Sequence, residues 1–239
     1  EQFQLNEETV WGGSPYNNTN PKAKDALPRI RQLIFEGKNK EAQELCGPTI
    51  CSPSANGMPY QTVGSLHLDF DGISNYNDYY RDLDIAKAIA TTRFTTNGVT
   101  YTREAYTSFP DQVLVIRLTA SQKKSISFTA KYTTPYKSNV VRSISSRKEL
   151  QLSGKANDHE GIKGKVEFTA LTRIENSGGS LEATSDSTLQ VKNANSVTLY
   201  VSIGTNFVNY KDVSGNALST AQKYLKQVNK NYAKSKAAH

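Results

Sequence analysis

Five aspartates lie close together in the sequence and could do acid–base chemistry. They are Asp69, Asp71, Asp78, Asp82 and Asp84. Enzymes that hydrolyse glycosidic bonds need two carboxyl groups that flank the scissile bond. Asp82 and Asp84, however, share one face of an expected strand, where basic neighbours such as Arg81 would pair with them. A catalytic pair is therefore conceivable, but these residues alone leave the activity undetermined.

Histidine is too scarce to suggest a metal site. The chain has three His residues, and His67 alternates with Leu66 and Leu68, so it faces away from those leucines. The segment Asp158-His159-Glu160-Gly161 could bind a cation, although turn chemistry explains an Asp and a Gly there more simply. We therefore predict neither a metal site nor a cofactor.

The two cysteines, Cys46 and Cys51, are too few for a disulfide framework or a zinc site. A bridge between them is conceivable in an oxidising compartment, but two unconnected cysteines are the simpler interpretation. The sequence also has no Gly-x-Ser-x-Gly elbow, P-loop or dinucleotide-binding fingerprint. Several common catalytic classes are thereby disfavoured.

The composition favours one β-rich domain. The chain has 239 residues, of which 36% are hydrophobic and 13 are Tyr. A compact chain of this size buries roughly 70–75% of the surface that it exposes when unfolded, which is enough for one large core. The longest apolar runs, such as Val113-Leu114-Val115-Ile116, are too short to cross a bilayer, so we expect no membrane span.

The formal net charge of +7 is unevenly distributed. Residues 1–120 carry 11 Lys and Arg against 14 Asp and Glu, whereas residues 121–239 carry 18 against 8. A basic half can indicate a nucleic-acid partner. Here, however, the lysines are scattered among Ser, Thr and Asn along expected strands. We therefore expect a solvated basic face and no nucleic-acid partner.

Two short helices are expected near the N-terminus. The first would begin at Asn20-Pro21 and end at Gly37. The second would begin at Asn39 and end at Gly47-Pro48. Apolar residues follow the helical spacing in the first of them, at Leu27, Ile30, Leu33 and Ile34. The sequence thus predicts a small helical hairpin, at residues 21–46, inserted in a β scaffold.

Most of the remaining chain has a hydrophobic period of two, as in strands. The pair Asn97-Gly98 favours a two-residue hairpin turn, which would place Phe94 opposite Tyr101 and Thr92 opposite Arg103. Further strands are expected at 113–118, 126–132, 150–152, 166–171, 189–191 and 197–203. Many strands without βαβ alternation predict a mainly β fold, a large antiparallel β-sandwich. Near the C-terminus, one lysine-rich helix is expected, with an apolar stripe at Ala221, Leu225, Val228 and Tyr232.

Several motifs in the first half of the chain occur in the order and spacing of a known family. They are QLNEETVW at 4–11, FEGK at 35–38, EAQEL at 41–45, PYQ at 59–61, GSL at 64–66, YRDLD at 80–84, NGVTYTRE at 97–104 and FPDQV at 109–113. These motifs resemble the N-terminal domain of glycoside hydrolase family 95, the α-L-fucosidases. The resemblance covers roughly residues 1–120.

The resemblance implies a large sandwich (a super-sandwich) that precedes an (α/α)₆ barrel and is joined to it by helices. In that family the barrel carries out inverting cleavage of α-linked L-fucose from glycan ends. None of the barrel motifs is present in these 239 residues, so no catalytic residue is assigned and the fragment should be inactive alone. The implied division is a sandwich domain at 1–218 and the start of a linker helix at 219–239.

The same resemblance implies the partners and the location. The expected partners are the catalytic (α/α)₆ domain of the same polypeptide and, through it, a fucosylated glycan. The expected location is secreted or periplasmic.

Loop 6–15 is the segment most worth weighing for a functional contact. Its candidates for contact with substrate or with another domain are Asn6, Glu7, Glu8 and Trp11. An aromatic face can stack on a pyranose ring, and carboxylates accept hydrogen bonds from sugar hydroxyls. The loop could instead pack on the barrel or cap the sandwich itself. The alternative to the whole interpretation is an independent carbohydrate-binding module, which would need exposed aromatic rings on one sheet face.

Overall fold

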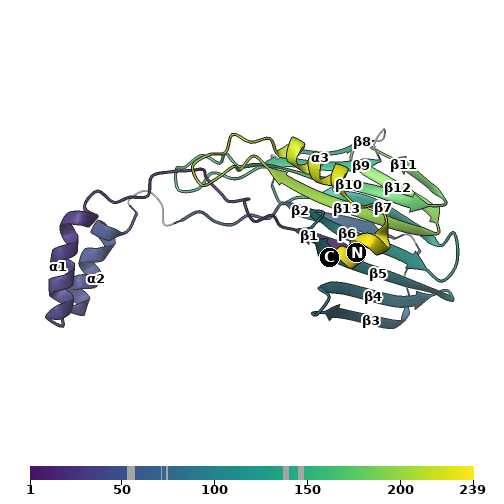
Figure 1. Ribbon diagram of the computed structural model, residues 1–239, viewed down its shortest axis with the longest axis horizontal. Helices are drawn as coiled ribbons and strands as arrows, with labels where there is room; N and C mark the ends of the chain where they lie inside the picture. The colour runs from purple at the N-terminus through teal and green to yellow at the C-terminus, as the bar shows by residue number, and fades with distance from the viewer. Residues whose placement is uncertain (53–56, 71, 74, 137–139, 145–147) are drawn as a thin grey trace.

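The computed structural model describes residues 1–239 except 53–56, 71, 74, 137–139 and 145–147. Two antiparallel sheets form a sandwich, which confirms the predicted fold class (Figure 1). The smaller sheet consists of β1 (Gln2–Leu5), β2 (Gly64–Asp69), β7 (Ile126–Thr133), β12 (Thr188–Ala194) and β11 (Ser180–Ala183), in that order. The larger sheet consists of β3 (Asn77–Asp84), β4 (Ile89–Thr96), β5 (Val99–Ser108), β6 (Val113–Ala120), β13 (Ser196–Thr205), β10 (Glu167–Ser177), β9 (Glu149–Lys155) and β8 (Val140–Ile144), also in spatial order.

The main core lies between the two sheets. Leu66 and Leu68 of β2 and Phe128 of β7 belong to the same buried cluster as Leu199 of the larger sheet. Burying side chains of this size contributes roughly 1.5–3 kcal/mol each. On the other face of β2, a ring nitrogen of His67 lies 2.8 Å from the Thr133 hydroxyl. The predicted alternation along this strand is therefore confirmed.

The predicted β-hairpin is also confirmed. β4 and β5 pair with Phe94 opposite Tyr101 and with Thr92 opposite Arg103. The turn residues Asn97-Gly98 have φ angles of 50° and 72°, as a type I′ turn requires. The rings of Phe94 and Tyr101 stack with their centroids 5.3 Å apart, which adds a cross-strand contact.

The second face of the larger sheet is covered by two helices, α3 (Ala217–Gln227) and α4 (Tyr232–Ala238) (Figure 1). The prediction of one continuous helix was wrong. The chain leaves helical geometry after α3, and the Asn231 side chain caps α4 by accepting a hydrogen bond from a backbone N–H in its first turn. The predicted stripe nevertheless packs as one cluster, with Ala221, Leu225 and Val228 buried and Tyr232 against them.

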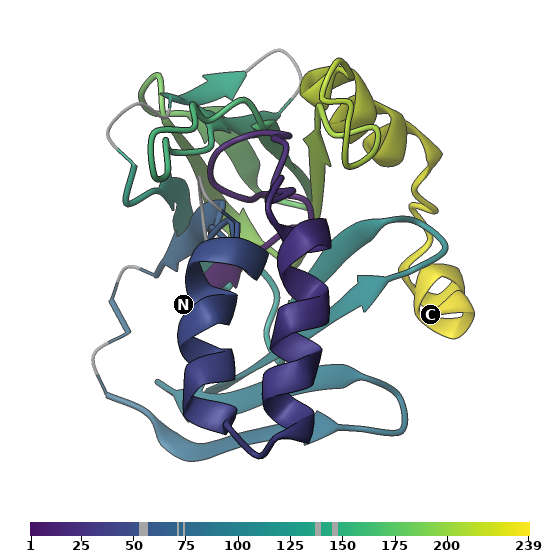
Figure 2. The ribbon, with the colours of Figure 1, turned by 90° about the vertical axis from the view of Figure 1, so that its left-hand side faces the viewer.

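The helical insertion projects from one end of the sandwich, and we call it the arm (Figure 1). It consists of α1 (Ala23–Phe35) and α2 (Asn39–Ile50), which Figure 2 shows side by side. The predicted end of the second helix at Gly47-Pro48 was wrong, because α2 continues to Ile50. The cause lies at Asn20, whose side-chain amide donates hydrogen bonds to the carbonyls of Pro48 and Cys51 and so caps the last turn.

Only part of the predicted apolar stripe of the arm is buried. Ile30 and Leu33 are buried between the two helices, whereas Leu27 and Ile34 are exposed. Cys46 packs against the same small cluster, Cys51 is exposed, and the two cysteines do not form a disulfide.

Candidate functional site

A groove with a volume of about 700 Å³ is formed by the loop that follows β1, by β5, by β13 and by α3. Three of the four predicted contact residues line it, namely Asn6, Glu7 and Glu8. They face side chains from distant parts of the chain, among them Thr107, Phe109, Ile203, Phe207 and Tyr224. The fold therefore gathers the polar part of the predicted site beside apolar and aromatic side chains.

Glu7 is half-buried in this groove and is held by neighbouring hydroxyl groups. Its Oε2 accepts hydrogen bonds from the backbone N–H of Thr9 at 2.8 Å and from the Thr9 hydroxyl at 2.6 Å. The Thr9 hydroxyl lies 2.7 Å from the hydroxyl of Thr205 in β13. Burial raises the pKa of the Glu7 carboxyl, the hydrogen bonds from Thr9 oppose the rise, and the charge of Glu8 adds to it. A carboxyl of this kind, in a groove, is a candidate for hydrogen bonding to a ligand.

Trp11, the fourth predicted residue, does not line the groove. Its indole N–H donates a hydrogen bond to the Glu8 carbonyl at 2.7 Å. Its ring meets the Tyr60 ring edge to face, with the centroids 5.3 Å apart. Since 44% of the Trp11 surface remains exposed, the indole is available to a partner outside this sandwich.

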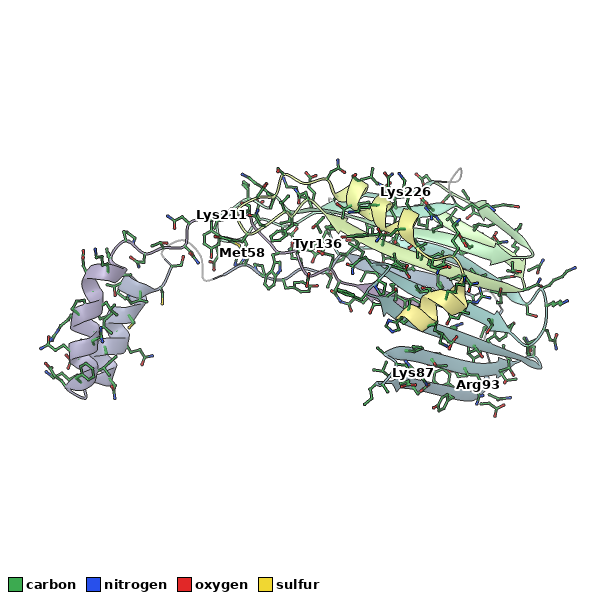
Figure 3. The ribbon with its side chains drawn as sticks, viewed as in Figure 1. Met58, Lys87, Arg93, Tyr136, Lys211 and Lys226 are labelled. Carbon is green, nitrogen blue, oxygen red and sulfur yellow. The ribbon has the colours of Figure 1, made fainter. Side chains whose placement is uncertain are left out.

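Exposed apolar side chains accompany Trp11 at the end of the sandwich from which the arm projects. We call the set the loop-end surface; it consists of Trp11, Tyr60, Phe207, Val208 and Tyr210. The Thr9–Thr205 contact brings together the loops that carry Trp11 and Phe207, and Tyr60 joins them through its contact with the Trp11 ring. Figure 3 shows Met58 and Lys211 at this end, where the arm leaves the sandwich. An exposed group of large apolar side chains is typical of an interaction surface.

Two of the clustered aspartates, Asp69 and Asp84, form ion pairs in the part of the chain that is described. Asp84 pairs with Lys87 at 2.9 Å, not with Arg81, and accepts the backbone N–H groups of the following turn. Asp69 pairs with Lys131 across β2 and β7 at 2.5 Å. The hydrogen bonds from these lysines lower the pKa of both carboxyls. Asp71 lies outside the described residues.

The segment around His159 is a tight turn. His159 and Ile162 exchange two backbone hydrogen bonds, and the Asp158 carboxylate accepts the backbone N–H of Gly164 at 2.9 Å. Turn chemistry thus accounts for this segment. Among the residues described, no three His, Cys, Asp or Glu residues are grouped so that they could hold a metal ion. In the same residues, no helix has the length and apolar character needed to cross a membrane.

A second cavity, of about 370 Å³, lies between β2, near one edge of the smaller sheet, and the edge of the larger sheet at β3, β4 and β5, and was not predicted. Its lining includes four aromatic residues, Phe70, Tyr76, Tyr79 and Phe94, together with Arg103. The Arg103 guanidinium lies 4.2 Å from the centroid of the Phe70 ring and pairs with the Glu1 carboxylate. Tyr76 and Tyr79 are more than half exposed. Phe70, Tyr76 and Tyr79 lie in one short stretch of the sequence, but Phe94 and Arg103 come from the following hairpin, and the sequence did not indicate that the fold brings them together.

The chain is similar to proteins of known family. Residues 1–210 match the family model described as "Glycosyl hydrolase family 65, N-terminal domain". The chain is 29% identical over 233 residues to "Alpha-L-fucosidase 2" of Arabidopsis thaliana, with 87% of this chain and 26% of that protein covered. It is 25% identical over 217 residues to "Probable alpha-fucosidase A" of Aspergillus oryzae, with 87% and 29% covered. A protein of the same name from Aspergillus niger is 31% identical over 128 residues, with 51% and 16% covered.

The matched region contains most of the molecule described above. It runs from β1 through β13 to Tyr210 and so includes the arm and the loop-end surface. The chain spans less than a third of the length of each of the three relatives. The family match and the relatives together confirm the predicted resemblance to the N-terminal domain of the α-L-fucosidases. The chain therefore belongs to the glycosyl hydrolase family 65 N-terminal domain family.

Proposed function

We propose that this chain is the non-catalytic N-terminal domain of an α-L-fucosidase-like glycoside hydrolase and that it supports the catalytic domain of the same polypeptide. The coverage of the relatives carries the proposal. Two proteins named as α-fucosidases align along 87% of this chain, but the alignments take up only 26% and 29% of their own lengths. Most of such an enzyme lies outside the aligned domain, so the domain is better suited to support the reaction than to perform it.

The proposal includes the division implied by the resemblance. Residues 1–218 would form the sandwich domain, and residues 219–239 would begin the connection to a catalytic (α/α)₆ barrel. The boundary falls within the first turn of α3, which begins at Ala217, so the proposed connection begins with helices that pack on the larger sheet. The proposed enzyme acts on fucosylated glycans and is secreted or periplasmic.

The loop-end surface is the proposed contact with the catalytic domain. Trp11 and Tyr210 leave 44% and 75% of their surfaces exposed. A large aromatic side chain buries 150–250 Å² when it is fully covered, so covering several such rings contributes on the order of several kcal/mol to docking. Asn6, Glu7 and Glu8 line the neighbouring groove and are the proposed polar margin of this contact.

Fucose release tests the proposal. We expect release from 2′-fucosyllactose and from an aryl α-L-fucoside by the full-length polypeptide and none by the chain 1–239. Release above a buffer control by pure chain 1–239 would show that the domain is catalytic. No release by the full-length polypeptide would contradict the fucosidase assignment. Unchanged activity and thermal stability after deletion of residues 1–218 would contradict the supporting role.

The aromatic cavity favours a second candidate function, an independent carbohydrate-binding module. Tyr76 and Tyr79 offer exposed rings on which a sugar could stack, with the Arg103 guanidinium beside them. This candidate predicts that fucosylated oligosaccharides bind the chain 1–239 with a dissociation constant of about 1 mM or tighter, as calorimetry would measure. Tyr79→Ala should abolish binding, whereas Tyr210→Ala, at a distant exposed tyrosine, should not.

A further inference from the structure

The arm is built around a core that is too small to hold it alone. Its buried residues, in the part of the chain described, are Ile30, Leu33 and Ala42, with Ala26, Leu45 and Cys46 packed against them. All six belong to the arm itself. The two helices have 13 and 12 residues, and isolated helices of this length are marginal in water. Pro28 and Pro48 each remove a backbone donor from them. The arm therefore needs a further surface against which to pack.

An apolar stripe on α1 is left exposed beside the core of the arm. Leu27 and Ile34 are seven residues apart, which places them on one side of the helix two turns from each other, and Phe35 follows Ile34. Their exposed fractions are 47%, 51% and 84%. This exposed stripe lies beside the buried face that carries Ile30 and Leu33. The arm thus presents large apolar side chains on a face that its own helices do not cover.

Asn20 ties the base of the arm together. It is buried, its side-chain oxygen accepts the backbone N–H of Lys22 at 3.0 Å, and its amide donates to the carbonyls of Pro48 at 3.2 Å and Cys51 at 2.9 Å. These bonds join the entry to α1 with the end of α2. The stripe is therefore carried on a hairpin with a defined base rather than on two independent segments.

We propose that the arm docks through Leu27, Ile34 and Phe35 onto the catalytic domain of the same polypeptide, an inference that rests on the proposed function. The aligned region takes up only 26% and 29% of the length of two relatives, which extend far beyond it. The rest of such a polypeptide is large enough to supply the domain that packs against the arm. The arm also leaves the sandwich at the loop-end surface (Figures 1 and 3). A single catalytic domain docked at that end would contact both the loop-end surface and the exposed stripe of the arm.

The charges on α1 indicate the chemistry of the surface that receives it. The helix carries Lys24, Arg29 and Arg31 against one acidic residue, Asp25. Charged residues at the margin of an interface steer docking and select the partner surface. The receiving surface should therefore be apolar at its centre, opposite Leu27 and Ile34, and acidic at its rim.

Hydrogen exchange read by mass spectrometry tests this inference on the full-length polypeptide and on dilute chain 1–239. We expect the amides of α1 and α2 to exchange at least about tenfold more slowly in the full-length polypeptide. In that polypeptide, the double substitution Ile34→Gln and Phe35→Gln should remove most of the protection, since both side chains are exposed in the chain described here. Ile85→Gln, at a side chain 87% exposed beyond β3, is the matched control and should leave the protection unchanged.

Three outcomes would overturn the inference. The first is equal exchange of the arm in the two proteins. The second is loss of protection to the same extent in Ile85→Gln as in the double variant. The third is protection in chain 1–239 that rises with concentration together with a dimer in sedimentation, because a second copy would then be the occupant.

Fucose release separates this inference from the proposed function. A full-length polypeptide that releases fucose but leaves the arm unprotected would overturn the docking of the arm alone. A protected arm in a full-length polypeptide that releases no fucose would overturn the fucosidase assignment and support contact of the arm with the rest of the polypeptide.

Discussion

Asp111, in the turn between β5 and β6, accepts a hydrogen bond of 2.8 Å from the hydroxyl of Ser235 in α4. The same carboxylate accepts the Ser108 hydroxyl at 2.9 Å and the backbone N–H of Asn229 at 3.2 Å. The Tyr106 hydroxyl in turn donates to Ser235 at 3.2 Å. This buried network joins residues more than a hundred positions apart and fastens the C-terminal helix to the larger sheet.

Ser235→Ala should lower the free energy of unfolding by about 1–3 kcal/mol, because Asp111 and Tyr106 each lose a buried hydrogen-bond partner. Urea denaturation of the chain 1–239 measures the change. Ser219→Ala on α3, where the side chain is exposed, is the control and should change the free energy by less than about 0.5 kcal/mol. Equal effects of the two substitutions would show that the network does not hold α4.

Glu104 binds α4 from β5 and should make stability depend on pH. It accepts hydrogen bonds from the Tyr232 hydroxyl at 2.7 Å and the Lys236 ammonium at 2.5 Å. Burial alone raises the pKa of the Glu104 carboxyl, but the bonds from Lys236 and Tyr232 outweigh it and leave the pKa below the ordinary value of 4.5. A carboxyl with a lowered folded pKa contributes stability that is present above its unfolded pKa and is lost as the pH falls through the folded value.

Glu104→Gln should therefore destabilise the chain at pH 7 and progressively less as the pH falls below about 4.5. Urea denaturation of both proteins between pH 7 and pH 3 gives the difference in unfolding free energy. A difference that stays constant over this range would contradict the role of the charged carboxylate.

Glu7 should behave in the opposite sense, because burial raises its pKa. The folded state then holds the proton more tightly than the unfolded state, so this group costs stability as the pH rises from about 4.5 through the folded pKa. Glu7→Gln keeps an acceptor for Thr9 but has no charge. We expect its stability relative to the unsubstituted chain to increase between pH 4 and pH 7 in urea denaturation. A relative stability that falls over this range would contradict the burial of Glu7.

Gly204 in β13 allows α3 to lie directly on the larger sheet. A Cβ at this position would lie 2.4 Å from the Ala217 carbonyl oxygen and 2.6 Å from the Ala221 nitrogen. Gly204→Ala should therefore displace α3 and cost about 1–3 kcal/mol. Gly47→Ala in α2 is the control, because a Cβ there meets no atom within 4 Å and alanine is the better helix former. If thermal unfolding shows that both substitutions are tolerated equally, α3 does not pack as closely as described.

The sequence predicted those parts of the fold whose signals are local. Asn97-Gly98 specifies a two-residue turn through its own backbone preferences, and that turn determines which residues of β4 and β5 pair, so the register could be predicted. The helix ends depended on distant groups instead. The continuation of α2 past Gly47-Pro48 relies on donors from Asn20, and the break between α3 and α4 is accompanied by the bond from Asn229 to Asp111. A strand was expected at Asp82 and Asp84, and β3 contains both, but its bounds were not predicted because its residues are mostly exposed and lack an apolar alternation.

Only the residues of the candidate site that lie together in one loop could be predicted from the sequence. Asn6, Glu7 and Glu8 are consecutive, so their chemistry was visible in the sequence. The walls opposite them come from β5, β13 and α3, which only the folded sheet brings together. Trp11 was expected beside them, but its indole N–H is bound to the Glu8 carbonyl and its ring lies against Tyr60, outside the groove.

Hydroxyl-radical footprinting read by mass spectrometry tests whether a catalytic domain covers the loop-end surface. The oxidation rates of Trp11 and Tyr210 are compared between the chain 1–239 and the full-length polypeptide. Both side chains are exposed in the chain described here, at 44% and 75%. If a catalytic domain covers this surface, both rates fall several-fold in the full-length polypeptide, while Tyr80, 51% exposed on β3, keeps its rate. Unchanged rates for Trp11 and Tyr210 would show that no catalytic domain covers the loop-end surface.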